Sequence, residues 1–196
     1  MSFRIGKIRF SMSFPLVAVM TAVIMFDTTM SVLICFIAAV MHELGHITVL
    51  KHYHSVPEEI RLTLFDIAIT DTDKYIRSDK AEMAVVAAGV AVNFISAAAG
   101  FAVYYFTGYE LVRVFSSAHL TLAMFNSLPV SNLDGGQALF IVLSRKLTPR
   151  RAEQVLKLLS YIILVPVAAA GVYVLFITGY NFTLLLTALY LIAAGV

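Results

Sequence analysis

The sequence is poor in charged residues and in cysteine. Only 13% of its 196 residues are charged, about half the share found in soluble domains. The formal net charge of +2 is too small to indicate a polyanionic partner such as nucleic acid. The single cysteine, Cys35, excludes an intramolecular disulfide and a cysteine-cluster metal site. The sequence also contains no internal repeat and no low-complexity tract.

Hydrophobic residues make up 60% of the chain, and its mean hydropathy is +0.89. A chain of this length is expected to form one domain, but a soluble core could not bury so much apolar surface. The composition therefore excludes a secreted, disordered or nucleic-acid-coating protein. It predicts an all-α, multi-pass protein of the lipid bilayer. We expect one integral-membrane domain over 1–196 and no soluble domain.

Six uncharged apolar runs mark the expected transmembrane helices. A helix needs about 20 apolar residues to cross the roughly 30 Å hydrocarbon core. The first run follows basic residues, as a signal peptide would, but no small-residue cleavage site closes it, so we expect a retained helix. The first and last runs are marginal in length, and the last stops without a polar flank, as in a truncated chain. The runs are 10–26, 31–50, 81–106, 114–144, 158–177 and 182–196.

The basic residues predict the orientation of these helices. Of the 14 Lys and Arg residues, only Arg113 falls outside the N-terminal stretch and the two loops that follow the second and fourth runs. Because basic residues favour the cytoplasmic side, we expect the N terminus and both loops in the cytoplasm. An even number of spans then places the C terminus there too.

The loop between the second and third runs has an alternating pattern. Ile60, Leu62 and Leu64 alternate with polar residues, and Ile67 and Ile69 alternate in the opposite phase. This period of two favours a short strand or β-hairpin at the membrane surface. An irregular loop touching lipid headgroups is the equally weighted alternative.

Ionisable residues inside the apolar runs are few, and such residues are costly in hydrocarbon. His42, Glu43 and His46 form an H-E-x-x-H pattern in the second run. On a helix, positions four apart share a face, so both imidazoles can bind one metal ion while the glutamate acts on metal-bound water. A buried polar cluster that packs helices or relays protons is the alternative.

The fourth run supplies the best candidate for a third metal ligand. Its 31 residues would form a helix about 46 Å long, which exceeds the hydrocarbon core, so the run must be broken. Pro129 and the Gly135-Gly136 pair provide the break, and Asp134 lies beside it. The histidines at 52 and 54 fit surface positions, and that at 119 fits helix packing or hydration.

The depths of the two elements agree. The second and fourth runs are both expected to cross from outside to inside. His46 lies five residues before Lys51, and Asp134 lies eleven residues before Arg145. Both side chains are therefore expected in the cytoplasmic half of the bilayer.

Together these residues resemble the site-2 protease family of intramembrane zinc metalloproteases. That family pairs H-E-x-x-H with an aspartate in an N-x-x-P-x-x-x-L-D-G stretch, which Asn126, Pro129, Leu133, Asp134 and Gly135 match. The resemblance covers the second to fourth runs, with a catalytic core at about 31–144. It implies Zn²⁺ as the cofactor. It implies that His42, His46 and Asp134 are the zinc ligands. It also implies that Glu43 is the catalytic acid/base.

A weaker family signature, A-G-P-x-x-N, resembles 88–93, with Val90 in place of proline. On this basis Asn93 is a candidate substrate-binding residue, as are Asn126 and Pro129, and Gly89 and Asn93 share a face that could approach the site. Small-residue helix packing is the alternative for that face. The short layout resembles the compact, sporulation-type branch.

The resemblance also implies a substrate: a membrane-associated regulatory protein, such as an anti-sigma factor or a transcription-factor precursor. Two other functions stay open. A metal or ion transporter could use a broken helix with buried His and Asp, although six spans without a repeat do not favour it. A catalytically inactive relative could bind membrane proteins without cutting them, although Glu43 is retained. The sequence has no serine-protease G-x-S or aspartyl-protease G-x-G-D motif in the runs.

Overall fold

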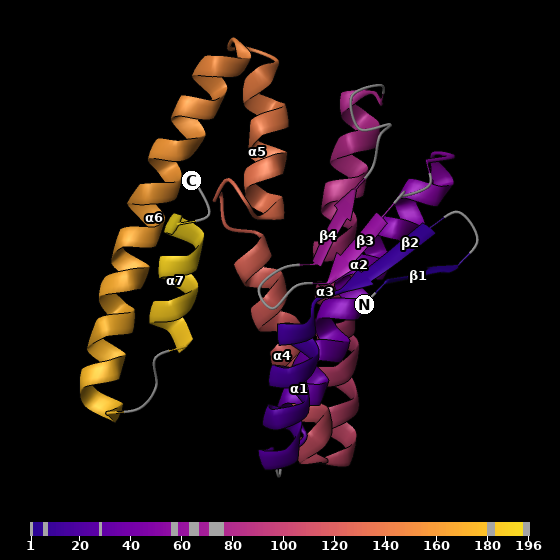
Figure 1. The fold of residues 1–196 in the computed structure, drawn as a ribbon, viewed down its shortest axis with the longest axis vertical. Helices are drawn as coiled ribbons and strands as arrows, with labels where there is room; N and C mark the ends of the chain where they lie inside the picture. The colour runs from indigo at the N-terminus through magenta and orange to yellow at the C-terminus, as the bar shows by residue number, and fades with distance from the viewer. Residues whose placement is uncertain are drawn as a thin grey trace. The chain divides into compact units, whose positions relative to one another are not determined.

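The computed structural model describes residues 2–5, 8–27, 29–55, 59–62, 67–70, 77–179 and 183–193. This part of the chain is mainly helical (Figure 1). The fold consists of two compact units, one spanning Met1–Met124 and the other Phe125–Val196. The helices are α1 (Phe14–Phe26), α2 (Ser31–His52), α3 (Asp79–Thr107), α4 (Glu110–Asn126), α5 (Asp134–Ser144), α6 (Pro149–Thr178) and α7 (Thr183–Ala193).

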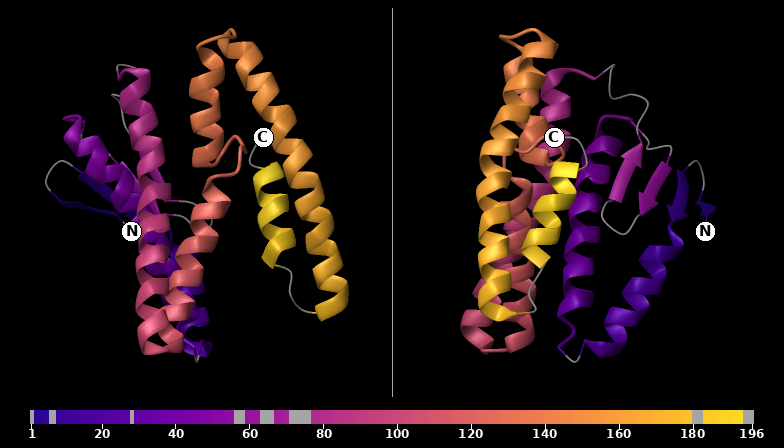
Figure 2. Two further views of the ribbon diagram at one scale, coloured as in Figure 1. Left: turned by 180° about the vertical axis from the view of Figure 1, so that it is seen from behind. Right: turned by 60° about the vertical axis from the view of Figure 1, so that its left-hand side comes forward.

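The first unit contains a four-stranded sheet in the order β1-β2-β3-β4. The first and last strand pairs are antiparallel hairpins, and β2 and β3 pair in parallel, with Arg9 opposite Glu59. The sheet leads directly into α1 (Figure 2). The strands are β1 (Ser2–Ile5), β2 (Ile8–Met12), β3 (Glu59–Leu62) and β4 (Ile67–Thr70).

The sheet confirms one expectation and corrects another. The alternating segment forms the β3–β4 hairpin; Leu64 lies outside the described residues. The expected first helix was wrong at its start, because Phe10 belongs to β2 and α1 begins only at Phe14. The apolar run alone does not distinguish helix from strand. Pairing of β2 with both β1 and β3 satisfies the backbone groups that a helix would have satisfied internally.

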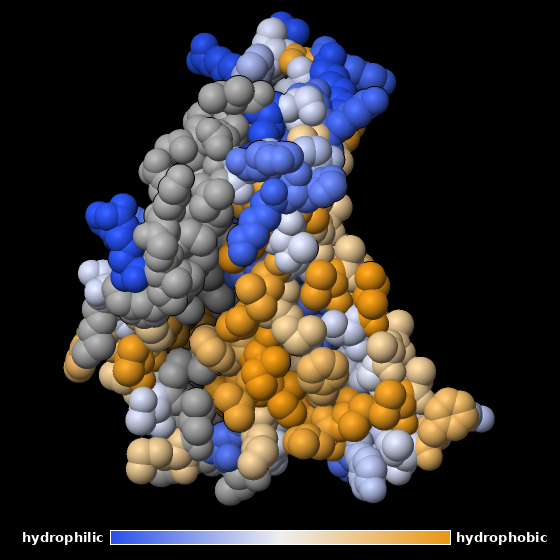
Figure 3. Space-filling view, turned by 90° about the vertical axis from the view of Figure 1, so that its right-hand side faces the viewer, coloured by the Kyte–Doolittle hydropathy of each residue, from blue (hydrophilic) through white to orange (hydrophobic). Residues whose placement is uncertain are grey.

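Three described helices are long and apolar enough to cross a membrane: α2, α3 and α6. They indicate an integral membrane protein, and the count of six spans stays a prediction. Many large apolar side chains are exposed, including Tyr105, Phe106 and Phe176, each more than 80% exposed. On the face drawn in Figure 3, hydrophobic side chains form a continuous region, and hydrophilic ones gather towards the top of the view. Such exposure suits contact with lipid.

The expected break in the fourth run is confirmed. Helix α4 ends at Asn126 and α5 begins at Asp134. In the second unit, the segment between them keeps its backbone hydrogen-bonded: the Val130 N–H donates to the Leu128 carbonyl at 2.8 Å, and the Leu133 N–H to the Val130 carbonyl at 2.9 Å. Irregular backbone at membrane depth requires such internal partners.

Helix α6 organises the second unit, and both α5 and α7 pack against it. Ser160 on α6 receives a hydrogen bond from the Ser131 N–H at 3.0 Å, which ties the broken segment to the helix. The buried core of the unit consists of Val130, Leu133, Leu164 and Leu191. This packing fixes the start of α5, where Asp134 lies.

Candidate metal centre

Helix α2 places His42 and His46 on one face, as the H-E-x-x-H spacing predicts. Both side chains are buried. Their rings meet edge to face, with centroids 4.8 Å apart, and their Nε2 atoms are 3.1 Å apart. Two nitrogens that share a tetrahedral zinc at about 2.0–2.1 Å would lie about 3.3 Å apart. The two imidazoles are therefore placed to share one ion.

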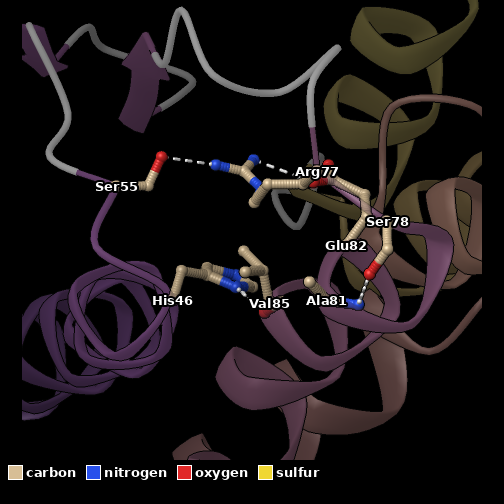
Figure 4. Close-up of polar contacts among 7 residues, drawn as sticks. All are labelled: His46, Ser55, Arg77, Ser78, Ala81, Glu82 and Val85. Atoms are coloured by element: carbon tan, nitrogen blue, oxygen red, sulfur yellow. Dashed lines mark hydrogen bonds and ion pairs between the residues drawn. The ribbon is translucent and has the colours of Figure 1, made fainter.

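The backbone of α3 fixes the protonation pattern of His46. Its Nδ1 lies 2.7 Å from the carbonyl oxygen of Val85 (Figure 4). A carbonyl oxygen only accepts hydrogen bonds, so Nδ1 must carry the proton. In the neutral ring, Nε2 then presents a lone pair, which is the form that binds a metal.

Asn93 of α3 is a hydrogen-bond partner of His42. This side chain is fully buried, and its amide group lies 3.1 Å from His42 Nδ1. The other end of the amide lies 2.9 Å from Nδ1 of His119 on α4. The shared face of Gly89 and Asn93 thus reaches the imidazoles, as the sequence suggested. The role of Asn93 in substrate binding stays a prediction, whereas its contact with His119 was missed.

Two glycines allow α2 and α3 to approach closely. A β-carbon on Gly89 would collide with His46 Nε2 and lie 2.7 Å from His42 Nε2. One on Gly45 would lie 2.9 Å from the Ala88 carbonyl oxygen. The glycine positions therefore leave open space at the two nitrogens and bring the facing backbone near them.

Glu43 and Asp134 lie where the motifs place them in their own elements. Glu43 directly follows His42 on α2 and is half-buried. Asp134 is the first residue of α5, in the second unit, and is buried. A β-carbon on Gly136 would collide with the Val130 carbonyl oxygen, so the start of α5 needs glycine there. Asn126 is the last residue of α4 and Pro129 lies within the break, and both are half-buried.

Among the described residues, His42, His46 and Asp134 are the group of metal-ligating side chains that could hold an ion, each offering one ligand atom. Imidazole nitrogen and carboxylate oxygen are ordinary zinc ligands, and a catalytic zinc commonly has three protein ligands. This donor set, the orientation of His46 and the space at Gly89 fit Zn²⁺. The histidines at 52 and 54 are exposed, and neither belongs to the group.

A partly buried ionic contact between Arg77 and Glu82 lies in the first unit, and no pattern in the sequence indicated it. Arg77 donates to Glu82 Oε2 from Nε at 3.0 Å and from Nη2 at 2.8 Å. Its Nη1 donates to Ser55 Oγ at 2.9 Å (Figure 4). Ser55 follows α2, and Arg77 precedes α3. The contact therefore joins the two ends of the segment that carries the β3–β4 hairpin.

Comparison with known proteins identifies the class of this fold. No family model matches the sequence. Among solved structures, the chain is similar to the site-2 protease from Methanocaldococcus jannaschii, with a TM-score of 0.66, 23% identity, and coverage of 97% of this chain and 92% of that one. The chain thus has the fold of a site-2 protease.

A curated relative gives the same result at the level of sequence. The zinc metalloprotease MJ0392 of Methanocaldococcus jannaschii is 33% identical over 119 residues, which cover 58% of this chain and 34% of the relative. The chain therefore matches about a third of that protein's length. Fold and sequence together confirm the resemblance to the site-2 protease family. The assignment to the sporulation-type branch stays a prediction.

Proposed function

We propose that this chain is an intramembrane zinc metalloprotease that hydrolyses a peptide bond within or next to a transmembrane segment. One observation carries the proposal: the facing Nε2 atoms of His42 and His46, 3.1 Å apart, beside the open space at Gly89. Asp134 is the proposed third ligand, in agreement with its place in the candidate metal-binding group. The similarity to a zinc metalloprotease supports the same function.

Glu43 is the proposed catalytic acid/base. Zinc held by the three ligands would supply Lewis-acid chemistry that makes water acidic near neutral pH. Glu43 takes a proton from the attacking water as its oxygen bonds to the scissile carbonyl carbon. The carbon–nitrogen bond then breaks, and Glu43 returns the proton to the leaving amine. The half-buried position of Glu43, one residue after a ligand, suits this role.

Zinc content and cleavage test the two parts of this proposal separately. Detergent-purified wild type should hold about one zinc per chain, and His46→Ala and Asp134→Ala should each lose it. Full zinc occupancy in Asp134→Ala would show that another residue is the third ligand. Glu43→Gln should retain zinc but cleave a panel of single-span membrane peptides about 10²–10⁴-fold more slowly.

The same experiment separates the protease from the two alternatives. A zinc-loaded wild type that cleaves every peptide in the panel no faster than Glu43→Gln does would favour an inactive relative. Zinc that crosses proteoliposome membranes at equal rates in wild type and Glu43→Gln would favour a transporter, because transport does not require a general base.

Strand β4 is a proposed docking edge for the substrate. It ends the sheet order, and only β3 pairs with it among the described strands. An unwound substrate segment could add to this edge as a further strand, which would expose its peptide bonds. Ile67→Pro removes a backbone donor from β4 and should slow cleavage while sparing bound zinc. Unchanged cleavage would count against this docking mode.

Asn126 and Pro129 are proposed to contact the substrate backbone near the break between α4 and α5. Both residues match the motif and are half-buried. The Asn126 side chain could donate a hydrogen bond to the substrate carbonyl. Asn126→Ala should therefore reduce cleavage more than zinc content, and equal losses of both would assign the residue to the metal site instead.

We further propose that both ends of the chain and the metal site face the cytoplasmic half of the bilayer, so that products are released to the cytoplasm. The distribution of basic residues supports this orientation. A reporter that is active only in the cytoplasm should be active when it is fused to either end of the chain. The proposed substrates are membrane-associated regulatory proteins of the anti-sigma-factor or transcription-factor-precursor type.

A further inference from the structure

A groove with a volume of about 430 Å³ runs between α2 and α3 in the first unit. This volume falls within the range of about 300–1,000 Å³ for small-molecule pockets. The floor forms where the two helices meet closely, because a β-carbon on Gly45 would lie 2.9 Å from the Ala88 carbonyl oxygen. The rim is open, with Leu44 51% and Ile95 69% exposed. The walls include Met41, Leu44 and Thr48 of α2 and Ala88, Ala91 and Ile95 of α3.

The groove lies on the side of α2 opposite the candidate metal ligands. Leu44 comes two positions after His42, and Thr48 comes two positions after His46. Residues two apart on an α-helix are separated by about 200° around its axis. An occupant of the groove is therefore separate from the proposed zinc site, and this inference does not rest on the proposed function.

The lining of the groove suits an apolar occupant. Thr48 carries the only polar side chain among the lining residues, and its hydroxyl donates to the Leu44 carbonyl oxygen at 2.6 Å. The groove therefore offers a ligand little besides aliphatic surface. Both helices are long and apolar enough to cross a membrane, so the open rim faces lipid. Lipid acyl chains are as apolar as leucine side chains and match this lining.

The C-terminal end of α2 and the N-terminal end of α3 form one end of the groove. Ser55, which follows α2, accepts a hydrogen bond from Arg77, which precedes α3, at 2.9 Å. The two helices then pass each other in opposite directions. Charged residues at these two helix ends therefore lie at the same end of the groove.

Two lysines lie on the groove side of the helices at this end. Lys51 follows Leu44 by seven residues, and Lys80 precedes Ala91 by eleven. These spacings are close to two and three full turns of an α-helix, so each lysine lies nearly in line with a lining residue. Both lysines are exposed. The groove thus joins an apolar channel to a pair of positive charges.

The two acidic residues in the first turn of α3 lie off the groove side. Asp79 precedes Ala88 by nine residues, which places it half a turn away around the helix. Glu82 forms an ion pair with Arg77 at 2.8 Å. The charge on the groove side at this end is therefore positive and suits an anion.

We propose that this groove binds one phospholipid with an anionic headgroup. One acyl chain lies in the groove, and Lys51 and Lys80 hold the phosphate at its end. Lysines near the ends of membrane helices extend towards the interface, where lipid phosphates lie. Met41 and Lys51 are ten residues apart, or about 15 Å along the helix. That length matches one leaflet, because the hydrocarbon core is about 30 Å thick.

The test is native mass spectrometry of the full chain, released from detergent micelles after addition of lipid. Phosphatidylglycerol and phosphatidylcholine with identical acyl chains are compared. We expect one phosphatidylglycerol to stay bound per chain, and much less phosphatidylcholine. Glycerol 3-phosphate, which has the phosphate but no acyl chain, should not be retained. Equal retention of the two lipids, or retention of glycerol 3-phosphate, would overturn the proposal.

The lysines are tested by the double variant Lys51→Gln, Lys80→Gln. One basic residue near anionic lipid contributes about fivefold to affinity, so the double variant should bind phosphatidylglycerol roughly 25-fold more weakly. The matched control is Lys146→Gln, Arg150→Gln, which removes the same charge from exposed positions of the second unit. An equal loss in both double variants would show general attraction between charges and would overturn the assignment to the groove.

The groove itself is tested by Ala91→Phe. Ala91 lines the groove and is exposed, so a larger side chain fills the space without entering the core. Ala169→Phe makes the same change at an exposed position of α6. Ala91→Phe should lose phosphatidylglycerol, and Ala169→Phe should retain it. Retention by both would overturn the proposal, as would a wild-type dimer that Ala91→Phe separates, because the occupant would then be a second copy.

Zinc content of the same variants separates this inference from the proposed function. The lysine variant and Ala91→Phe should both hold as much zinc as wild type, because the groove faces away from the histidines. Wild type that binds lipid but no zinc would overturn the protease and leave the lipid site. Wild type that binds zinc but shows no preference for phosphatidylglycerol would do the reverse.

Discussion

Gly89 stands directly against Nε2 of His46, the nitrogen proposed to bind the metal. A β-carbon there would collide with that Nε2 and lie 2.6 Å from the neighbouring Cε1 carbon. It would also lie 2.7 Å from His42 Nε2. The absence of a side chain at Gly89 of α3 therefore lets α3 approach the two histidines of α2 that are proposed to bind the metal.

Gly89→Ala should abolish zinc binding while leaving the chain folded, because the methyl group would fill the space at both nitrogens. Gly100→Ala is the matched comparison: it is the same change in α3, and its β-carbon would meet Ser116 and Phe115 instead. Metal analysis and thermal unfolding in detergent would measure both effects. If both variants lost zinc equally, and only in proportion to the amount of folded protein lost, a direct role for Gly89 would be contradicted.

The buried Arg77–Glu82 pair should stabilise the ends of the hairpin segment. Its side chains are 8% and 13% exposed, so Arg77→Met leaves a carboxylate with little solvent. We expect a loss of roughly 3 kcal/mol in unfolding free energy, at the lower end for a broken buried pair. Cleavage by added protease within β3 or β4 should also become faster.

The double variant Arg77→Met, Glu82→Met is the control for that prediction. It removes both charges and should recover part of the lost stability. A double variant less stable than Arg77→Met would mean that Glu82 acts through partners other than Arg77.

Gly136→Ala should loosen the segment between α4 and α5 within the second unit. Its β-carbon would collide with the Val130 carbonyl oxygen, and a backbone atom cannot move aside as a flexible side chain can. Hydrogen exchange at the Ser131 amide, which donates to Ser160, should become faster. Zinc affinity should fall as well if Asp134 is the third ligand.

Gly171→Ala provides the comparison in the same unit. A β-carbon there would lie 2.7 Å from the Leu185 nitrogen, so it crowds the contact between α6 and α7. It should lower thermal stability without speeding exchange at Ser131 selectively. Equal exchange rates in the two variants would assign the effect to general loosening of the unit.

Asp27 should make the stability of the start of α2 depend on pH. Hydrogen bonds from the Thr29 side chain, and then from the Val32 N–H at 2.7 Å, hold the pKa of this carboxyl below its ordinary value of 3.8. A lowered folded-state pKa adds stability that is present above the unfolded value and is lost as the pH falls through the folded value. Wild type should therefore unfold at a higher temperature than Asp27→Asn at pH 7, and the difference should shrink below pH 3.8. A constant difference would exclude the charge as the cause.

Much of the candidate site was predictable because its signals are local. The spacing of His42 and His46 requires only helical periodicity to place both rings on one face, and the structure confirms that arrangement. The break before Asp134 follows from the length of the fourth run together with Pro129, and it too is confirmed. The roles of Glu43, Asn126 and Pro129 remain predictions.

Other features depend on residues far apart in the chain. The parallel pairing of β2 with β3 joins Arg9 to Glu59, and no local pattern distinguished that strand from the start of a helix. The contact between Asn93 and His119 likewise depends on how α3 and α4 pack. A lone histidine in an apolar run gives no signal of its partner.

The sequence by itself determined a membrane protein with two histidines and a glutamate on one helix and an aspartate at a helix break. Those conclusions need only composition, periodicity and the cost of burying charge. Tertiary structure decided what surrounds the histidines: the carbonyl of Val85, the space at Gly89 and the amide of Asn93. These contacts arise because α3 packs against α2, and side-chain hydrogen bonds require a distance and direction that only packing in three dimensions can fix.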